Sequence, residues 1–515
     1  MAIYFEKTDR LIIPRWREYN RLSPSAEHLP LLNESDTIES EVPLNVFTQR
    51  KIWAWEARQD VGNAWDLVNT AYVDRNFDIA IGAAKYLKDN SENLHINLRR
   101  IIAEVLGEEY EEAAKKDAEP LGLGSIKEIT RRKVRAIKAR LINYLRNEFA
   151  WLELARLYSI LGVNDKARKC IIVAVELSDK KNRYILRAAS RFYYHVDDYE
   201  AAQYTVRLSP LFKKDPWLLS ADLSYSFKMK RNYTFGKHSL NLVESKNYNP
   251  ASISELSGML AKLEYENKDF KSARKFTKIS LISPNDNSLA QAEWISHEVG
   301  NISINPWINA LENGYEARAY EHFYVNDFNR SVEEGISWLL DQPFSKRACN
   351  FVTYICTALS DNQQLGIEVG LHGLSCNPNN FNLLNNVAFA YATLGDAVNA
   401  EKYLSLMYNE ISSEKERCYY YATKGLLAFR KNEPVEGRRY YKDAIAIAEK
   451  NKDGEGLNIL AEAYLLRESA LANQLPIGVA LDAVRNLIKV KRSFDVENQI
   501  RHIIQTLAKK IEVRR

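Results

Sequence analysis

The sequence is poor in the residues that interrupt helices. Its 515 residues include only 14 Pro and 20 Gly, and these lie mostly between segments with a helical period. Because both residues disfavour helix interiors, their scarcity favours long helices joined by short turns. The longest uninterrupted apolar runs reach about six residues, far short of the roughly 20 that a transmembrane helix needs. The sequence therefore predicts no membrane span.

Neither sign of charge dominates the chain. The 71 basic and 67 acidic residues are mixed along the sequence and give a formal net charge of +4. This balance demands neither a nucleic acid nor an anionic membrane as partner. The five cysteines are scattered and odd in number, and the N-terminus lacks the apolar run of a signal peptide. We interpret the cysteines as reduced core residues and expect a cytoplasmic protein.

Catalytic and metal-binding motifs are also missing. The eight histidines are isolated, with no HExxH pattern and no spaced cysteine pair beside them, which disfavours a zinc site. The sequence contains neither the G-x-S-x-G motif nor the kinase motifs. Two Arg-x3-His pairs, Arg191 with His195 and Arg318 with His322, are too isolated to indicate a nuclease. We predict no enzyme activity, no metal and no cofactor.

The strongest pattern that is present runs from Trp151 to Leu177. Trp151, Leu154, Ala155 and Tyr158 recur at the spacing of one helix face. The segment 161–164 interrupts the period, and a second apolar face follows with small residues where two helices would approach closely. The pattern predicts a pair of antiparallel helices joined by a tight turn.

This spacing resembles the tetratricopeptide repeat (TPR), a helical pair of about 34 residues. A second clean copy places Leu384, Val387, Ala388 and Tyr391 at the same intervals. Weaker copies fall nearly in phase between and after the two. The expected close-packing positions are Ala155, Ala189, Asp222, Ala261, Ala319, Tyr354, Ala388, Gly425 and Ala461. The resemblance implies an all-α, TPR-like right-handed superhelix of antiparallel helix pairs, with an irregular N-terminal arm and a C-terminal helical cap.

The repeat pattern divides the chain into six regions. Prolines and polar residues make 1–45 an irregular arm, which could dock on the solenoid or order on a partner; its apolar residues, Trp16 among them, favour docking. The other regions are a helical region with one degenerate repeat and a basic helix (46–147), repeats (148–282), an irregular insertion (283–312), repeats (313–450) and C-terminal helices with a cap (451–515).

The predicted helix at 125–147 has a basic side. Its candidate contacts for an acidic partner or RNA are Lys127, Arg131, Arg132, Arg135 and Lys138. An apolar stripe on the same helix gives the simpler interpretation, in which the helix packs by that stripe and its basic side is solvated. The scarcity of aromatic residues in the helix argues against base stacking.

In TPR families the first helix of each pair lines a concave groove. The resemblance therefore implies a partner-binding groove formed by Arg156, Arg183, Tyr193, Tyr320, Phe323, Asn382, Asn385, Asn386, Phe389, Tyr419 and Phe429. Side-chain amides can both donate to and accept from the backbone of an extended peptide. Asn385 and Phe389 fall outside the packing positions, so we expect their replacement to weaken partner binding and to change thermal stability little.

These patterns together favour a non-catalytic scaffold or adaptor that binds another protein. Two alternatives stay open at this stage. The protein could be a regulatory or sensor subunit of a separately encoded effector enzyme in a stress or defence complex, or an RNA-binding helical-repeat protein. The sequence leaves the oligomeric state and the identity of the partner undetermined.

Overall fold

The protein is built from helices. The computed structural model describes residues 1–3, 10–18, 46–74, 77–90, 96–108, 126–143, 145–245, 247–451, 456–489 and 493–514. Within these residues there is no β-strand. No helix in the described part of the chain is both long and apolar enough to cross a membrane.

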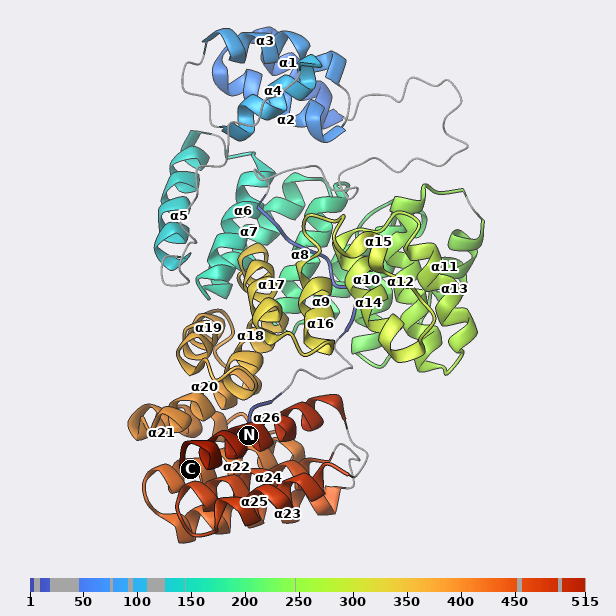
Figure 1. Cartoon of the computed structure of the whole chain (residues 1–515). Coiled ribbons are helices and arrows are strands. Elements are labelled where there is room, and N and C mark those ends of the chain that lie inside the picture. Colours follow the sequence, from blue (N-terminus) through green and yellow to red (C-terminus); the bar gives the residue numbers. More distant parts are fainter. Residues whose placement is uncertain are drawn as a thin grey trace.

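An N-terminal lobe precedes the repeats and has its own core (Figure 1). It consists of α1 (Val46–Ala57), α2 (Val61–Asp74), a 3-10 turn (Phe77–Ala80), α3 (Ile81–Asn90) and α4 (Ile96–Leu106). The basic helix α5 (Ile126–Asn143) follows and packs against the first repeat helix. Residues 109–125 lie outside the described residues.

The rest of the chain is a TPR-like solenoid of helix pairs. The pairs are α6 (Glu148–Ile160) with α7 (Asn164–Leu177), α8 (Arg183–His195) with α9 (Tyr199–Arg207), α10 (Pro216–Lys228) with α11 (Gly236–Glu244), and α12 (Pro250–Glu266) with α13 (Phe270–Ser280). They continue as α16 (Tyr315–Tyr324) with α17 (Phe328–Asp341), α18 (Lys346–Ala358) with α19 (Gln363–Cys376), α20 (Phe381–Leu394) with α21 (Ala397–Tyr408), α22 (Glu414–Arg430) with α23 (Pro434–Asn451), and α24 (Leu457–Leu471) with α25 (Ile477–Leu487).

The predicted phase of the repeats is confirmed. All nine close-packing positions are buried, including the less suitable Asp222 and Tyr354. Asp222 is tolerated because Arg207 of the preceding helix pairs with its carboxylate at 2.5 Å. At Gly425 a Cβ would lie 2.8 Å from the Tyr441 ring, so that crossing requires glycine.

The turns within the repeats share one backbone conformation. Gly162 and Gly395, in the two best-matched repeats, have φ of 72° and 81°. The weaker repeats place Asp, Lys or Asn in the same left-handed region, for example Asp197, Lys268 and Asn432. Because L-residues pay a steric cost there, the repeated turn reflects the geometry of the helix pair rather than local preference.

The solenoid curves until distant repeats meet. The turn after α6 touches the end of α19, where the Cys376 thiol donates to the Ile160 carbonyl at 3.1 Å. A Cβ on Gly162 would lie 2.1 Å from the Ser375 carbonyl oxygen. Gly162 is therefore required both by its positive φ and by this close approach.

The region predicted as an irregular insertion contains most of another repeat. α14 (Asp286–Val299) packs between α12 and α16 as a first helix would. The short α15 (Asn305–Ile308) stands where a second helix is expected. A small core that includes Leu289, Ile304 and Ile308 fills the space. The 58-residue step in the sequence pattern thus corresponds to a degenerate helix pair.

The C-terminal helix does more than cover the last repeat. α26 (Phe494–Arg514) packs on α24 and α25 but also returns to earlier repeats. The Phe494 ring lies 5.5 Å from the Phe323 ring of α16, and Tyr354 of α18 donates to the Asp495 carbonyl at 3.4 Å. Figure 1 shows the two ends of the chain close together beside α26.

Candidate functional site

The described parts of the N-terminal arm lie against the helices of the solenoid (Figure 1). Two of its stretches are described: the tip, residues 1–3, and the charged stretch, residues 10–18. Both contain side chains that are almost fully buried, including Met1, Ile12 and Trp16. Docking, the favoured interpretation of the arm, therefore holds for these two stretches. The intervening and following residues lie outside the described chain.

The tip is held as an extended peptide. Asn386 accepts from the Ile3 amide at 2.7 Å and donates to the Ile3 carbonyl at 3.1 Å. Asn385 donates to the Met1 carbonyl at 2.8 Å, and Gln499 of α26 donates to the Ala2 carbonyl at 3.4 Å. These bonds reach the backbone, while the Met1 α-amino group donates to the Thr423 hydroxyl at 3.2 Å and the three tip side chains are buried in the core.

The charged stretch is held mainly by ion pairs. Arg17 bridges Asp286 of α14, at 2.6 Å, and Asp341 of α17, at 2.7 Å. Arg15 joins the same Asp286, at 3.3 Å, to Glu316 of α16. Burial alone would raise the pKa of Asp286, but Arg17 and Arg15 hold it below its ordinary value. The stretch thereby ties α14 to the helix pair α16–α17 that follows it.

Other contacts extend this stretch across the groove. Arg10 lies 3.6 Å from the centroid of the Tyr320 ring and pairs with Glu293 at 2.5 Å. At the opposite end, Glu18 pairs with Lys133 of α5 at 2.7 Å. The Trp16 ring packs edge-on against Phe344 at 5.7 Å. The charged stretch thus contacts helices from α5 to α18.

Several residues predicted to line an open groove are instead covered. Arg156 is buried and pairs with Glu153, and Arg183 pairs with Asp215 at 2.6 Å. The covered aromatic and amide positions are Tyr320, Phe323, Asn385, Asn386 and Phe389. The arm and α26 occupy the space in front of them, which the sequence pattern could not reveal.

Two expectations require correction. Phe429 packs between α22 and α23, where a Cβ on Gly437 would lie 2.5 Å from its ring, so it is not a groove residue. Asn385 and Phe389 were expected to affect stability little, but both are at least 98% buried. Asn385 bonds to the arm, and the Phe389 ring packs against Tyr464 at 5.8 Å. Their replacement must therefore affect stability as well.

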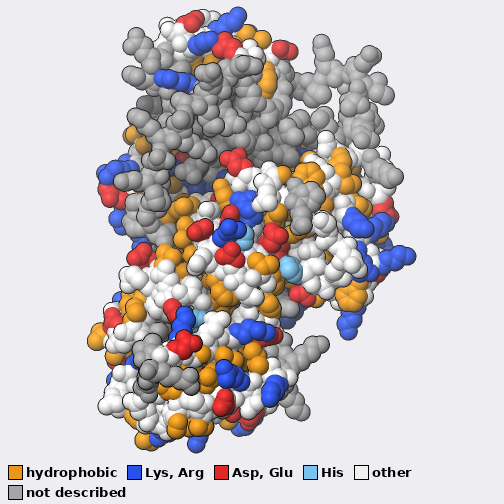
Figure 2. All heavy atoms as spheres, in the orientation of Figure 1, with side chains coloured by type: hydrophobic (Ala, Val, Ile, Leu, Met, Phe, Trp, Pro, Cys, Tyr) orange, Lys and Arg blue, Asp and Glu red, His pale blue; other side chains and the backbone are white. Residues whose placement is uncertain are grey.

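The basic helix behaves largely as its simpler interpretation predicts. Arg131, Arg132, Arg135 and Lys138 are exposed, and Lys127 is half-buried. Leu141 is buried, and Val134 and Ile137 pack against the solenoid core. Figure 2 shows basic and acidic side chains interspersed over the face in view.

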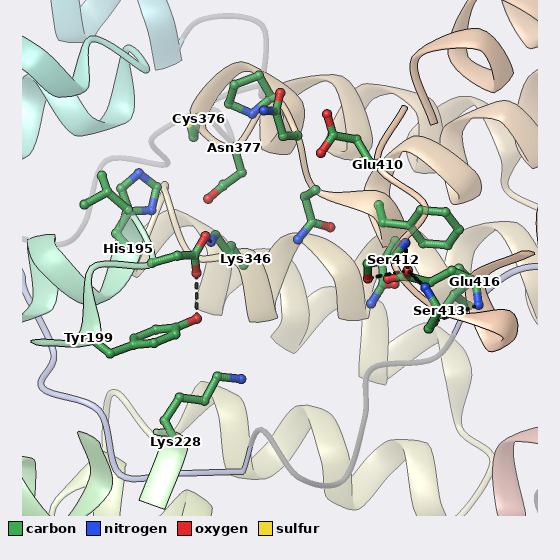
Figure 3. A pocket seen from close by; sticks show the side chains of 18 of the residues that line it. His195, Tyr199, Lys228, Lys346, Cys376, Asn377, Glu410, Ser412, Ser413 and Glu416 are labelled. Atoms are coloured by element: carbon green, nitrogen blue, oxygen red, sulfur yellow. Dashed lines mark hydrogen bonds and ion pairs between the residues drawn. The ribbon is translucent and has the colours of Figure 1, made fainter. Parts of the chain in front are cut away.

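An open pocket of about 800 Å³ remains on the concave side between the two halves of the solenoid. Among the predicted groove residues, Asn382 and Tyr419 line it, while Tyr193 lies half-buried elsewhere on α8. In Figure 3, His195, Tyr199 and Lys228 lie on one side and the Ser412–Glu416 segment on the other. The Lys346 ammonium, which also lines the pocket, pairs with the Asp197 carboxylate at 2.5 Å.

The pocket wall contains polar atoms without partners. The side-chain oxygens Oδ1 of Asn164 and Asn377 are buried and accept no hydrogen bond from any described residue. Both nitrogens of the buried His195 ring also lack a partner within the described chain. Unsatisfied buried polar groups are costly, and Asn164, Asn377 and His195 place such groups in the wall of this pocket.

Sequence reasoning missed most of this pocket because it considered only first helices. Tyr199 begins a second helix, Lys228 ends α10, and Asn377 and Asn380 lie in the connection between repeats. The run Cys376–Asn382, with four asparagines in seven residues, was the available signal. No motif singled it out, because amides in a connection usually indicate turns and caps; Asn380 does cap α20.

Among the described residues that line the pocket, Cys376 carries the one thiol. Burial raises the pKa of the Cys376 thiol to about 12, so it is protonated at neutral pH. All five cysteines are buried and none forms a disulfide. Within the described residues no group of three or more His, Cys, Asp or Glu side chains is placed to hold a metal ion.

Comparisons with known proteins give likeness in fold only. No protein-family model and no curated protein matches the sequence. The Cut9–Hcn1 hetero-tetramer of APC/C is similar in structure over 90% of this chain and 93% of that chain, with 13% identity and a TM-score of 0.34. Yeast Tom70 matches over 88% and 96% with 11% identity and a TM-score of 0.30, and the human IFIT1 dimer with PPP-AAAA over 76% and 94% with 14% and 0.38.

Proposed function

We propose that this protein is a non-catalytic scaffold or adaptor that binds an extended segment of a partner protein in the open pocket. The observation that carries the proposal is the binding of the tip. Asn385 and Asn386 hold an extended backbone by paired amide hydrogen bonds. The groove of this chain therefore has the chemistry for peptide recognition, and one occupant is already part of the chain.

The open pocket offers similar chemistry beside the tip. Ile3 itself borders the pocket, together with Asn382 and Tyr419. The unpartnered Oδ1 atoms of Asn164 and Asn377 would accept backbone N–H groups of a bound segment. Tyrosine rings supply contact area at a small cost in side-chain entropy. A segment of a partner could thus extend the groove that the tip already occupies.

The test is a titration of the full chain with a partner recovered from native cells. We expect the Asn382→Ala, Tyr419→Ala double variant to lose about 2 kcal/mol or more of binding free energy, as hot-spot residues do. Asn382→Trp, which adds bulk to the pocket, is expected to reduce binding as well. Asn399→Ala with Tyr408→Ala, on α21 and outside the pocket, is the matched control.

Unchanged affinity in both pocket variants would place the partner elsewhere and end the proposal. A larger loss from charge reversal at Arg131, Arg135 and Lys138 would favour the basic helix instead. If the ligand captured in that case were RNA, its affinity would fall steeply with salt. A partner with enzyme activity that changes on binding would identify the regulatory-subunit alternative.

A further inference from the structure

A second, smaller pocket adjoins the first and contains an uncompensated cation. It has a volume of about 240 Å³ and lies where the charged stretch of the arm passes α8 and α18. Arg191 of α8 lines it with only 7% of its surface exposed. Its guanidinium stacks on the Phe344 ring at 5.0 Å and lies 5.8 Å from the Tyr194 ring. It forms no hydrogen bond or ion pair with a residue that the structure describes.

The surroundings of Arg191 contribute no negative charge. Burial, with a smaller contribution from the nearby Arg15, lowers the pKa of Arg191 to about 10. Tyr194 and Tyr225 act in the opposite direction and raise the pKa of Arg191. Arg191 is therefore still a cation at neutral pH, in a site where transfer from water is costly and no carboxylate offsets the cost.

The neighbouring His195 ring also lacks a hydrogen-bond partner within the described chain. His195, one turn along α8, also lines the pocket and is 3% exposed. Burial, Arg191 and Lys346 hold the pKa of His195 well below its ordinary value, so the ring is neutral. A neutral imidazole has one N–H donor and one acceptor, and neither is used within the described chain.

The remaining charges leave the pocket positive. Arg15 and Arg347 are already paired with Glu316. Lys228 and Lys346 also line the pocket, and Asp197 is the only acidic side chain among the lining residues described, paired with Lys346. Positive groups therefore approach the cavity from α8, α10 and α18.

We propose that this pocket binds an oxyanion of the phosphate type, carried by a small molecule, with Arg191 and His195 as its principal hydrogen-bond donors. A guanidinium donates to two oxygens of such an anion at once, and the imidazole N–H supplies a third bond. Lys228 and Lys346 add positive charge at the rim. The volume suits phosphate, pyrophosphate or the phosphate end of a larger ligand that extends into the adjoining pocket. This site does not depend on the protein-binding role proposed above.

The experiment measures phosphate and pyrophosphate binding to the full chain by calorimetry and by thermal unfolding. Ionic strength is held constant with sodium chloride. We expect pyrophosphate to raise the Tm of the wild-type protein by a few degrees and Arg191→Gln to weaken binding about ten- to hundredfold, because bonds to a charged group are lost. Arg168→Gln is the matched control: that arginine also stacks on aromatic rings but is more exposed and pairs with Asp198.

Equal binding by the wild type and Arg191→Gln, or no binding by either, would overturn the proposal. If the protein bound an O-phosphoserine peptide but neither phosphate nor pyrophosphate, the proposal that a small molecule carries the oxyanion would be wrong. In buffer without phosphate, Arg191→Gln should be at least as stable as the wild type, since a buried unpaired charge is removed. A lower Tm for Arg191→Gln than for the wild type would instead mean that the guanidinium stabilises the fold by packing against its neighbouring rings. If Arg191→Gln does not fold, His195→Phe tests the site, because it removes the donor and keeps a ring against Phe344.

Discussion

The two docked stretches of the arm occupy one groove by different chemistry. The tip is neutral and is held by side-chain amides that bond to its backbone. The charged stretch is held by arginines that meet carboxylates from α14, α16 and α17. Amide contacts recognise extended backbone of any sequence, whereas the ion pairs require arginine at particular positions. The tip end of the groove thus binds through backbone contacts and buried apolar side chains, whereas the middle of the groove requires charged side chains.

The comparison also separates what each stretch contributes. Arg15 and Arg17 connect α14 with the α16–α17 pair, so the charged stretch holds neighbouring repeats together. The tip contacts α20, α22 and α26 and closes the space between the C-terminal helix and the repeats. We therefore expect the two stretches to respond differently to mutation, pH and salt.

The largest effect is expected from removal of the two arginines. Arg15→Ala with Arg17→Ala would leave Asp286, Glu316 and Asp341 with fewer partners in a buried site. Breaking a buried ion pair costs about 3–5 kcal/mol, and we expect a loss of at least that size in the free energy of urea unfolding. The control is Arg330→Ala, which removes an arginine from an exposed ion pair. Arg183→Ala would not serve as the control, because its ion pair is buried as well. Equal losses from both would contradict a special role for the charged stretch.

A smaller loss is expected at the tip. Asn386→Ala removes both hydrogen bonds to Ile3, which should cost about 1–3 kcal/mol because buried backbone groups lose their partner. Hydrogen exchange would detect it as faster exchange of the tip amides. Residues 10–18 should keep their protection, and Asn399→Ala, an asparagine bonded locally to Asp396, should leave both stretches unchanged. Simultaneous loss of protection in both stretches would show that they dock as one unit.

Acid should weaken the charged stretch first. The pKa of Asp286 is lower in the folded protein than its ordinary value, so its stabilisation is present above about pH 4 and is lost as pH falls through the folded pKa. We expect the Tm to fall over that range and Arg17→Met to fall less steeply. Each unit of pKa shift corresponds to about 1.4 kcal/mol. If the Tm of the wild type and that of Arg17→Met fell in parallel as the pH is lowered, the Arg17–Asp286 pair would not be the source of the pH dependence.

Salt is expected to have the smallest effect. Raising sodium chloride from roughly 0.1 to 1 M shortens the screening length from about 10 to about 3 Å, but buried pairs are screened little. The protection of residues 10–18 should therefore change by less than about 1 kcal/mol, and that of the tip should not change. A steep salt dependence of the charged stretch would mean that its ion pairs are reached by solvent.

The sequence was sufficient to predict the solenoid because a repeat is a local signal. Small residues such as Ala155 and Ala388 fall at helix crossings whose partners lie within the same pair or the next one. The period therefore fixed the phase of the repeats even where Asp222 or Tyr354 replaced the small residue. The region around α14 reads as an insertion in the sequence because the second helix of its pair is reduced to a single short turn.

What occupies the groove was decided only by the tertiary structure. Asn386 is identifiable from the sequence as a groove residue, but its partner Ile3 lies 383 residues away. Likewise, Arg191 and His195 belong to one repeat, while Lys346 comes from another half of the solenoid. A local period sets where each side chain points relative to its own helix. Superhelical curvature accumulates over many repeats, and it alone brings the arm, α26 and the two pockets together.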